Sequence, residues 1–121
     1  IVLKSDDAYP FFLKAELLAA RKEFDAALEA YRAALELSPG DDYYYVRTAI
    51  AFARAGRRDE AIKALRLASQ LAPENDAYDG MLESLLRLEG RTAEADELSE
   101  GLGDLDPYDH DLVERFEAEI L

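Results

Sequence analysis

The chain of 121 residues has no cysteine, and its only histidine is His110. The lack of cysteine excludes a disulfide framework, a zinc site with thiolate ligands and a cysteine nucleophile. No apolar run approaches the roughly 20 residues of a membrane-spanning helix, so we expect no insertion into a membrane. These absences leave the cellular compartment open, although we expect a soluble protein and favour the cytoplasm.

Basic residues are scarce in the second half of this acidic protein. Residues 73–121 contain only Arg87, Arg91 and Arg115, and they carry the whole net charge of −13, because the positive and negative charges of residues 1–72 cancel. Such a chain gains nothing from counterion release on a polyanion, so nucleic acid and anionic membranes are excluded as expected partners. A basic partner and a solvated acidic face both explain the charge, and we favour the solvated face.

Proline is rare but periodic. Pro39, Pro73 and Pro107 lie 34 residues apart, in the segments ELSPGDDYY, QLAPENDAY and DLDPYDHDL. A fixed period of this size is typical of stacked structural repeats, each of which contacts mainly its neighbours.

Each period contains two amphipathic helical patterns. In the first period Ala27, Leu28, Tyr31, Ala34 and Leu35 fall on one helical face, and the pattern recurs 34 residues later. The third copy, around residues 95–103, has lost several of its apolar residues. Short polar residues precede the first helix of each repeat and are placed to cap it: Asp7, Asp41 or Asp42, and Asn75 or Asp76.

The turn between the two helices of a repeat ends at a glycine in two of the three copies. Gly56 and Gly90 occupy the position where a helix commonly ends in a left-handed residue. Lys22 takes this place in the first repeat, where we expect local backbone strain.

This pattern resembles the tetratricopeptide repeat (TPR) family. The resemblance rests on family positions 4, 7, 8, 11, 20, 24, 27 and 32, which in the second repeat are Tyr45, Thr48, Ala49, Phe52, Ala61, Leu65, Ala68 and Pro73. The first repeat matches as well, and the third matches least. The resemblance implies an all-α fold, a right-handed α-solenoid of three helix-turn-helix repeats with a C-terminal capping helix.

The resemblance also implies a single domain over residues 1–121, with repeats at 8–41, 42–75 and 76–109. The capping helix is expected over residues 110–121, where Leu112, Val113, Phe116 and Ile120 make an apolar stripe. Residues 1–7 are expected to form the end of a preceding helix or a lead-in.

The first helix is apolar on more than one side. Besides Phe11 and Phe12 it carries Leu13, Leu17 and Leu18. A terminal repeat needs a polar outer face. The chain is therefore interpreted as a piece of a longer protein or as a molecule that self-associates through its N-terminal helix, with a decayed native start as the remaining alternative.

The sequence offers little catalytic or metal-binding chemistry. The acidic cluster around His110 fails as a calcium loop, because a loop starting at Asp104 would have Asp109 where glycine is required and Arg115 where glutamate is required. No nucleophile motif and no glycine-rich phosphate loop is present. We therefore expect no enzyme activity, no metal site and no cofactor, and we interpret the cluster as a turn with a helix cap.

In TPR proteins the first helix of each repeat lines a concave groove, and the resemblance places the partner-binding residues there. Carried over to this chain, the groove residues are Tyr9, Phe12, Glu16, Tyr43, Val46, Arg47, Ile50, Arg54, Met81, Ser84 and Arg87. Tyrosine, methionine and arginine are enriched in protein interfaces. The alternative is that Val46, Ile50 and Met81 pack under a C-terminal helix that folds back into the groove.

The resulting hypothesis is a non-catalytic scaffold that holds a partner peptide or helix in its concave groove. Two alternatives stay open. One is a structural or self-assembly segment of a larger chain that stacks through its N-terminal face, and the other is an accessory module beside a catalytic domain outside this chain.

Overall fold

A computed structural model describes residues 7–121 as helices and short connections, without a strand in that range. The helices are α1 (Tyr9–Ala20), α2 (Phe24–Leu37), α3 (Asp42–Arg54), α4 (Arg58–Leu71), α5 (Asp76–Leu88), α6 (Thr92–Leu102) and α7 (Pro107–Ile120). The expectation for residues 1–7 lies, except for Asp7, outside the described residues. No helix within residues 7–121 is long and apolar enough to cross a membrane.

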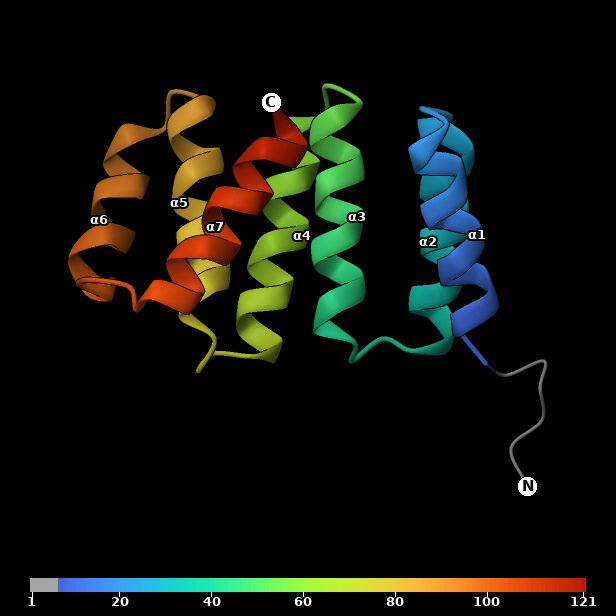
Figure 1. Cartoon of the computed structure of the whole chain (residues 1–121), viewed down its shortest axis with the longest axis horizontal. Coiled ribbons are helices and arrows are strands. Elements are labelled where there is room, and N and C mark those ends of the chain that lie inside the picture. The colour runs from blue at the N-terminus through green and yellow to red at the C-terminus, as the bar shows by residue number, and fades with distance from the viewer. Residues whose placement is uncertain (1–6) are drawn as a thin grey trace.

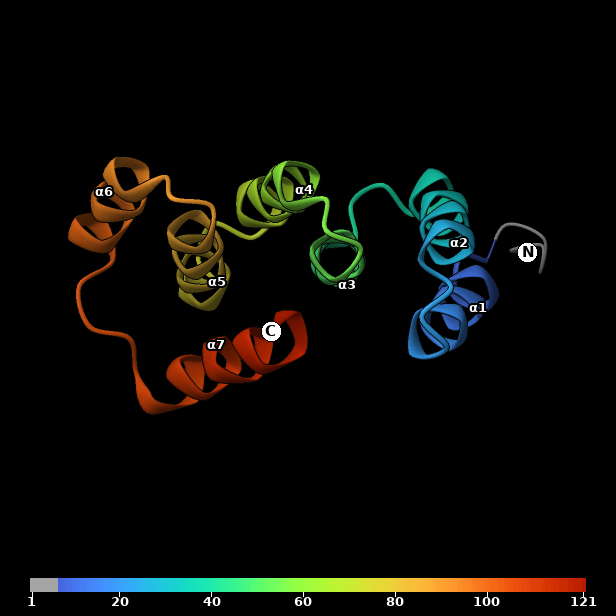
Figure 2. The same ribbon diagram turned by 90° about the horizontal axis from the view of Figure 1, so that it is seen from above.

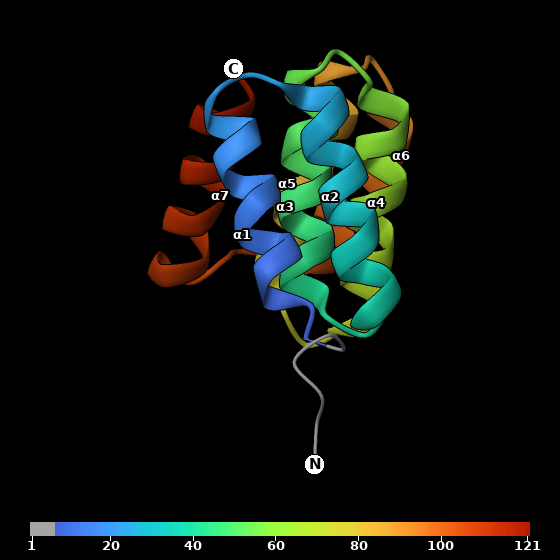
Figure 3. The ribbon, with the colours of Figure 1, turned by 90° about the vertical axis from the view of Figure 1, so that its right-hand side faces the viewer.

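Successive helices form three hairpins, α1–α2, α3–α4 and α5–α6, which stand side by side in chain order (Figure 1). Seen from above, α1, α3 and α5 lie toward one face of the array, and α2, α4 and α6 lie toward the other (Figure 2). Figure 3 looks along the array from the end formed by α1 and α2. The predicted all-α helical solenoid is confirmed.

Local capping explains where several helices begin. The side chain of Asp41 accepts a hydrogen bond from the backbone N–H of Tyr44, and Asn75 accepts one from Ala77, at the starts of α3 and α5. At the start of α1, the capping side chain belongs to Asp7, two residues before the first helical residue. It accepts a hydrogen bond from the backbone N–H of Tyr9 at 2.9 Å. These bonds satisfy N–H groups that a first helical turn leaves without a partner.

The hairpin turns follow the glycine pattern. Gly56 and Gly90 have φ values of 81° and 79°, and Lys22, at the same place in the first repeat, has φ 62°. The predicted strain at Lys22 therefore has a structural basis, since the left-handed region disfavours residues that carry a Cβ.

The buried side chains form two clusters. The first lies between α1 and α2 and centres on Phe12 and Tyr31, with Ala51 of α3 at its border. The second spans α3 to α7 and includes Leu65, Leu85 and Phe116. Many of the buried residues in both clusters are alanines, whose small side chains allow neighbouring helices to pack closely.

The degenerate third repeat ends the array. Helix α6 is the shortest of the described helices, and Ala95 is its only buried residue. Asp96 and Ser99 stand where the first two repeats have Leu28 and Tyr31 or Ile62 and Leu65. The outer face of α6 is therefore polar, as the end of a repeat stack requires.

The C-terminal helix α7 starts at Pro107, three residues before the start expected from the sequence. Asp106 caps it by accepting a hydrogen bond from the N–H of Asp109, and Pro107 occupies the first turn, where its missing N–H is not needed. Helix α7 crosses the face of α5 and reaches α3, and it scarcely touches α6 (Figures 1 and 2). It therefore covers part of the concave face instead of extending the stack.

Candidate partner-binding face

Helix α7 covers the centre of the predicted groove. Val46, Ile50 and Met81 are buried in one cluster with Val113 and Phe116 of α7. Of the two alternatives for these three residues, the structure shows the second, in which the C-terminal helix folds back into the groove. In this arrangement they serve as the floor under α7.

Polar contacts and one close approach hold α7 in place. Ser84 donates a hydrogen bond to Glu117 at 2.9 Å, and Arg47 pairs with Glu119 at 2.9 Å. At Gly80 of α5 the two helices are so close that an added Cβ would lie 2.7 Å from Cγ2 of Val113. A side chain at position 80 would therefore collide with Val113 unless α7 or its side chains shifted.

Arg47 joins three parts of the molecule through its guanidinium group. It pairs with Glu16 of α1 at 3.1 Å and with Glu119 of α7, and Glu16 also accepts a hydrogen bond from the hydroxyl of Tyr31. Although burial lowers the pKa of Arg47, the carboxylates of Glu16 and Glu119 outweigh it and raise that pKa. Burial, followed by the hydrogen bond to Glu16, raises the pKa of Tyr31.

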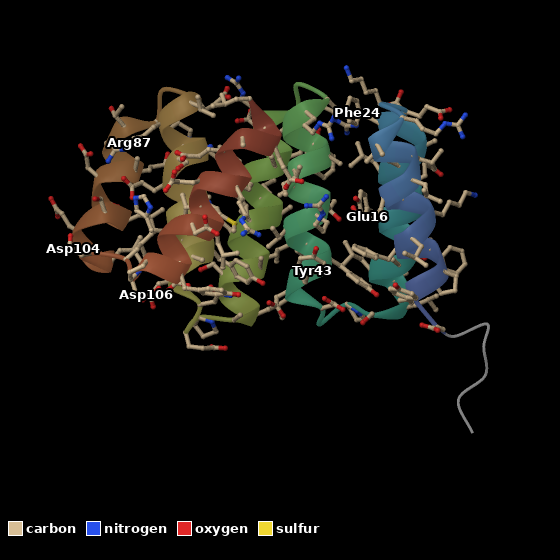
Figure 4. All side chains as sticks on the ribbon, viewed as in Figure 1. Glu16, Phe24, Tyr43, Arg87, Asp104 and Asp106 are labelled. Atoms are coloured by element: carbon tan, nitrogen blue, oxygen red, sulfur yellow. The ribbon has the colours of Figure 1, made fainter. Side chains whose placement is uncertain are left out.

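Aromatic rings cluster beside this charged group. Phe12 is buried and stacks on Tyr44 with 4.3 Å between ring centroids, and it also contacts Tyr9 and Tyr43. Tyr43 is 52 % exposed. Figure 4 shows Tyr43 near the start of α3 and Glu16 halfway along α1. Five of the predicted groove residues (Tyr9, Phe12, Glu16, Tyr43 and Arg47) thus lie together where α1 meets α3.

An exposed apolar stripe extends this cluster along α1. Tyr9, Leu13 and Leu17 are spaced four residues apart and therefore lie on one helical face. All three are exposed, Leu17 to 68 %. Helix α1 has no counterpart of α7 covering it among the described residues.

Two of the predicted groove residues lie elsewhere. Arg54, at the end of α3, places its guanidinium 5.3 Å from the ring centroid of Phe24 in α2. Arg87 pairs with Glu83 at 2.9 Å and with Asp96 of α6 at 3.0 Å, at the other end of the array from Tyr43 (Figure 4). Neither arginine points its charge at the cluster around Arg47.

The acidic cluster near His110 behaves as a helix start. Asp106 caps α7, and the imidazole of His110 lies 2.8 Å from the carboxylate of Glu114 one turn later. Burial, then the charges of Asp106 and Asp76, raise the pKa of Asp109. No group of three or more metal-ligating side chains with suitable placement occurs between residues 7 and 121.

A groove that the sequence did not predict lies on the opposite face. A cavity of about 700 Å³ lies between α2 and α4, with α3 as its floor. Tyr45, at family position 4 of the second repeat, is half-buried and lines this groove. The repeat alignment does contain a sign of this groove. The second repeat has the small Ala64 at the position where the third repeat has the larger Leu98.

These features define the class of the protein as an all-α helical-repeat protein with a partly covered concave face. A sequence model described as Tetratricopeptide repeat matches residues 18–85, more than half of the chain. The chain therefore belongs to the tetratricopeptide repeat family, as the resemblance predicts.

Solved structures show the same fold. The chain is similar to the type III secretion chaperone SycD of Yersinia enterocolitica, solved in complex with a peptide of the translocator YopD. The TM-score is 0.73 and the identity 16 %, over 93 % of this chain and 88 % of that one. It is also similar to the Sgt2 TPR domain from Aspergillus fumigatus, with a TM-score of 0.68 and 22 % identity over 98 % and 85 % of the two chains. No curated protein matches the sequence.

Proposed function

We propose that this protein is a non-catalytic interaction module that holds a peptide or helix of a partner protein on its concave face, beside α7. The observation that carries the proposal is the exposed apolar surface of Tyr9, Leu13, Leu17 and Tyr43. Exposed apolar groups that gather on one face are typical of interaction sites. A SycD structure contains a bound peptide, which supports peptide binding by this fold.

Helix α7 is an internal example of what the concave face accepts. It is amphipathic, buries Val113 and Phe116 against α3 and α5, and places carboxylates against Arg47 and Ser84. A partner helix beside it would use the same helix-in-groove mode. Because Arg47 is already paired with Glu16 and Glu119, the remaining surface on α1 favours apolar and aromatic side chains of the partner.

The proposal is tested by replacing Leu17 or Tyr43 with a photo-crosslinking amino acid in cells of the source organism. We expect both positions to crosslink to the same partner protein. The matched control is Leu88, an exposed leucine at the far end of α5. Equal crosslinking at Leu88, or none at Leu17 and Tyr43, would show that the α1 face is not the binding site.

Self-assembly through the first helix is the second candidate function, and the high exposure of Leu17 favours it. If two copies pair through this stripe, sedimentation equilibrium will show a concentration-dependent dimer. Leu17→Asp should then give a monomer while Leu88→Asp does not. A wild-type chain that stays monomeric over a wide concentration range would exclude this candidate.

A further inference from the structure

The groove on the face away from α7 lies at the junction of the first and second repeats. Helix α2 contributes Leu28, Arg32 and Leu35, which the spacing i, i+4 and i+7 places on one helical face. Tyr45 of α3 and Ala64 of α4 complete its central part. Residues 25–36 of α2 line the groove over a length of about 16 Å, which is three helical turns.

The next junction along the chain holds the counterpart of Arg32 in a closed arrangement. Arg66 pairs with Glu94 at 2.7 Å and so ties α4 to α6. The residues 34 positions earlier are Arg32 and Glu60. Glu60 pairs with Arg57, but Arg32 forms no ion pair with any residue of the described range 7–121. Equivalent arginines at the two junctions therefore differ in whether they form an ion pair within the described residues.

The two junctions also differ in how they are filled. Leu98 packs against the core of the second junction, and the cavity there measures about 310 Å³. The first junction has Ala64 at the corresponding place. In addition, a hydrogen bond of 2.5 Å between Ser69 and Asp79 closes the second junction. The residues at the same positions of the first junction are Leu35 and Tyr45, which form an apolar wall of the groove.

We infer that this groove is a second docking site, which takes one face of an amphipathic helix from a partner protein. The helix supplies a carboxylate that pairs with Arg32 and an apolar side chain on each side of that carboxylate. One apolar side chain fills the space above Ala64, and the other packs on Leu35 and Tyr45. This site is separate from the concave face of the proposed function.

Volume and charge set limits on the partner. A cavity of about 700 Å³ holds several side chains but not a whole helix of three turns, so the partner backbone stays at the rim. Glu29 and Glu36 also line the groove. They would repel additional carboxylates, which restricts the inserted face to a single acidic residue. Asp25 and Glu60 line the groove as well, and its other cations are Lys63 and Arg57, which pairs with Glu60.

The test uses a dye-labelled peptide of about 14 residues, made of alanine and glutamine and blocked at both ends. It carries Leu, Glu and Leu at positions i, i+4 and i+7, the spacing of the facing residues on α2. Fluorescence anisotropy measures its affinity for the full chain. We expect saturable binding that Arg32→Ala weakens about tenfold, since a buried charge-assisted contact is lost.

Three comparisons make the result specific. Arg66→Ala is the matched control, because it removes the equivalent arginine from the closed junction and should leave the peptide affinity unchanged. Ala64→Leu should weaken binding by filling the space, with circular dichroism to confirm folding. Replacing the peptide glutamate with glutamine should weaken binding to the wild type but not to Arg32→Ala.

Absence of saturable binding, or equal affinity for the wild type and Arg32→Ala, would overturn the inference. A wild-type dimer that Arg32→Ala dissociates would also overturn it, because the occupant would then be a second copy of the chain. Crosslinking at Leu17 and Tyr43 should be unchanged in Arg32→Ala, so failure of this site is distinguishable from failure of the proposed concave site.

Discussion

Lys22 adopts the backbone conformation that Gly56 and Gly90 adopt in the later repeats. A side chain in the left-handed region costs about 1 kcal/mol relative to glycine, because its Cβ crowds the following carbonyl. Lys22→Gly is therefore expected to raise the free energy of unfolding by up to about 1 kcal/mol, measured as a higher midpoint in urea.

Lys22→Ala is the control for this change, since it removes the charged chain but keeps the Cβ. If Lys22→Ala stabilises the protein as much as Lys22→Gly does, the effect comes from the lysine side chain and not from the backbone.

Two buried tyrosines make the free energy of unfolding depend on pH in the alkaline range. Burial and the hydrogen bond to Glu16 raise the pKa of Tyr31 above its ordinary value of 10.0, and burial and the hydrogen bond to Asp42 raise that of Tyr78. Because the folded state binds these protons more tightly than the unfolded state, their stabilising contribution is complete below pH 10 and is lost as the pH rises above it.

We therefore expect the free energy of unfolding in urea to fall between pH 9 and pH 11 by more in the wild type than in Tyr78→Phe. That variant has no phenol proton at this site to release on unfolding. Identical slopes for the two proteins would show that Tyr78 does not determine the alkaline transition.

At the scale of elements, the contact of α7 with α5 depends on a glycine. In most helix interiors Gly→Ala stabilises by roughly 0.5–1 kcal/mol. At Gly80 we expect the opposite sign, because the new Cβ would meet Val113, whose branched side chain has little freedom to move. Thermal unfolding of Gly80→Ala should therefore show a lower Tm.

Gly101 of α6 is the matched control, because nothing lies within 4 Å of a Cβ added there. Gly101→Ala is expected to raise the Tm. An increase for both variants would mean that α7 does not pack against Gly80 in solution.

At the scale of the whole molecule, we expect the first hairpin to open more easily than α3 to α5. Its core is separate from the cluster that spans α3 to α7, and the groove removes contacts on one side of its junction. On the other side, the main links to α3 are the pair Glu16–Arg47 and the stacking of Phe12 on Tyr44. Regions with fewer buried contacts unfold locally at lower free energy.

Hydrogen exchange should therefore be faster in α1 and α2 than in α3 to α5. Arg47→Ala should accelerate exchange in α1 further, because it removes the ion pair that joins α1 to α3. Arg66→Ala is the control and should affect α4 and α6 instead. Uniform exchange across all helices would indicate that the array unfolds as one unit.

Much of this architecture follows from local sequence. The period of 34 residues, the amphipathic patterns, the capping residues Asp41 and Asn75 and the glycines at 56 and 90 act within a few residues of their own positions. Helix formation, capping and tight turns depend on such short-range interactions. The fold could therefore be predicted, and so could the cluster of Tyr9, Phe12 and Tyr43 on neighbouring first helices.

The placement of α7 and the groove between α2 and α4 depend on the tertiary structure. The apolar stripe of α7 suits either the end of the stack or the concave face, and the surfaces of α3 and α5 decide between them, with Gly80 giving Val113 room. Arg32 and Arg66 occupy equivalent repeat positions, yet within residues 7–121 Arg66 forms an ion pair and Arg32 does not. Whether an arginine meets its partner depends on the separation of packed helices, which residues far apart in the chain determine together.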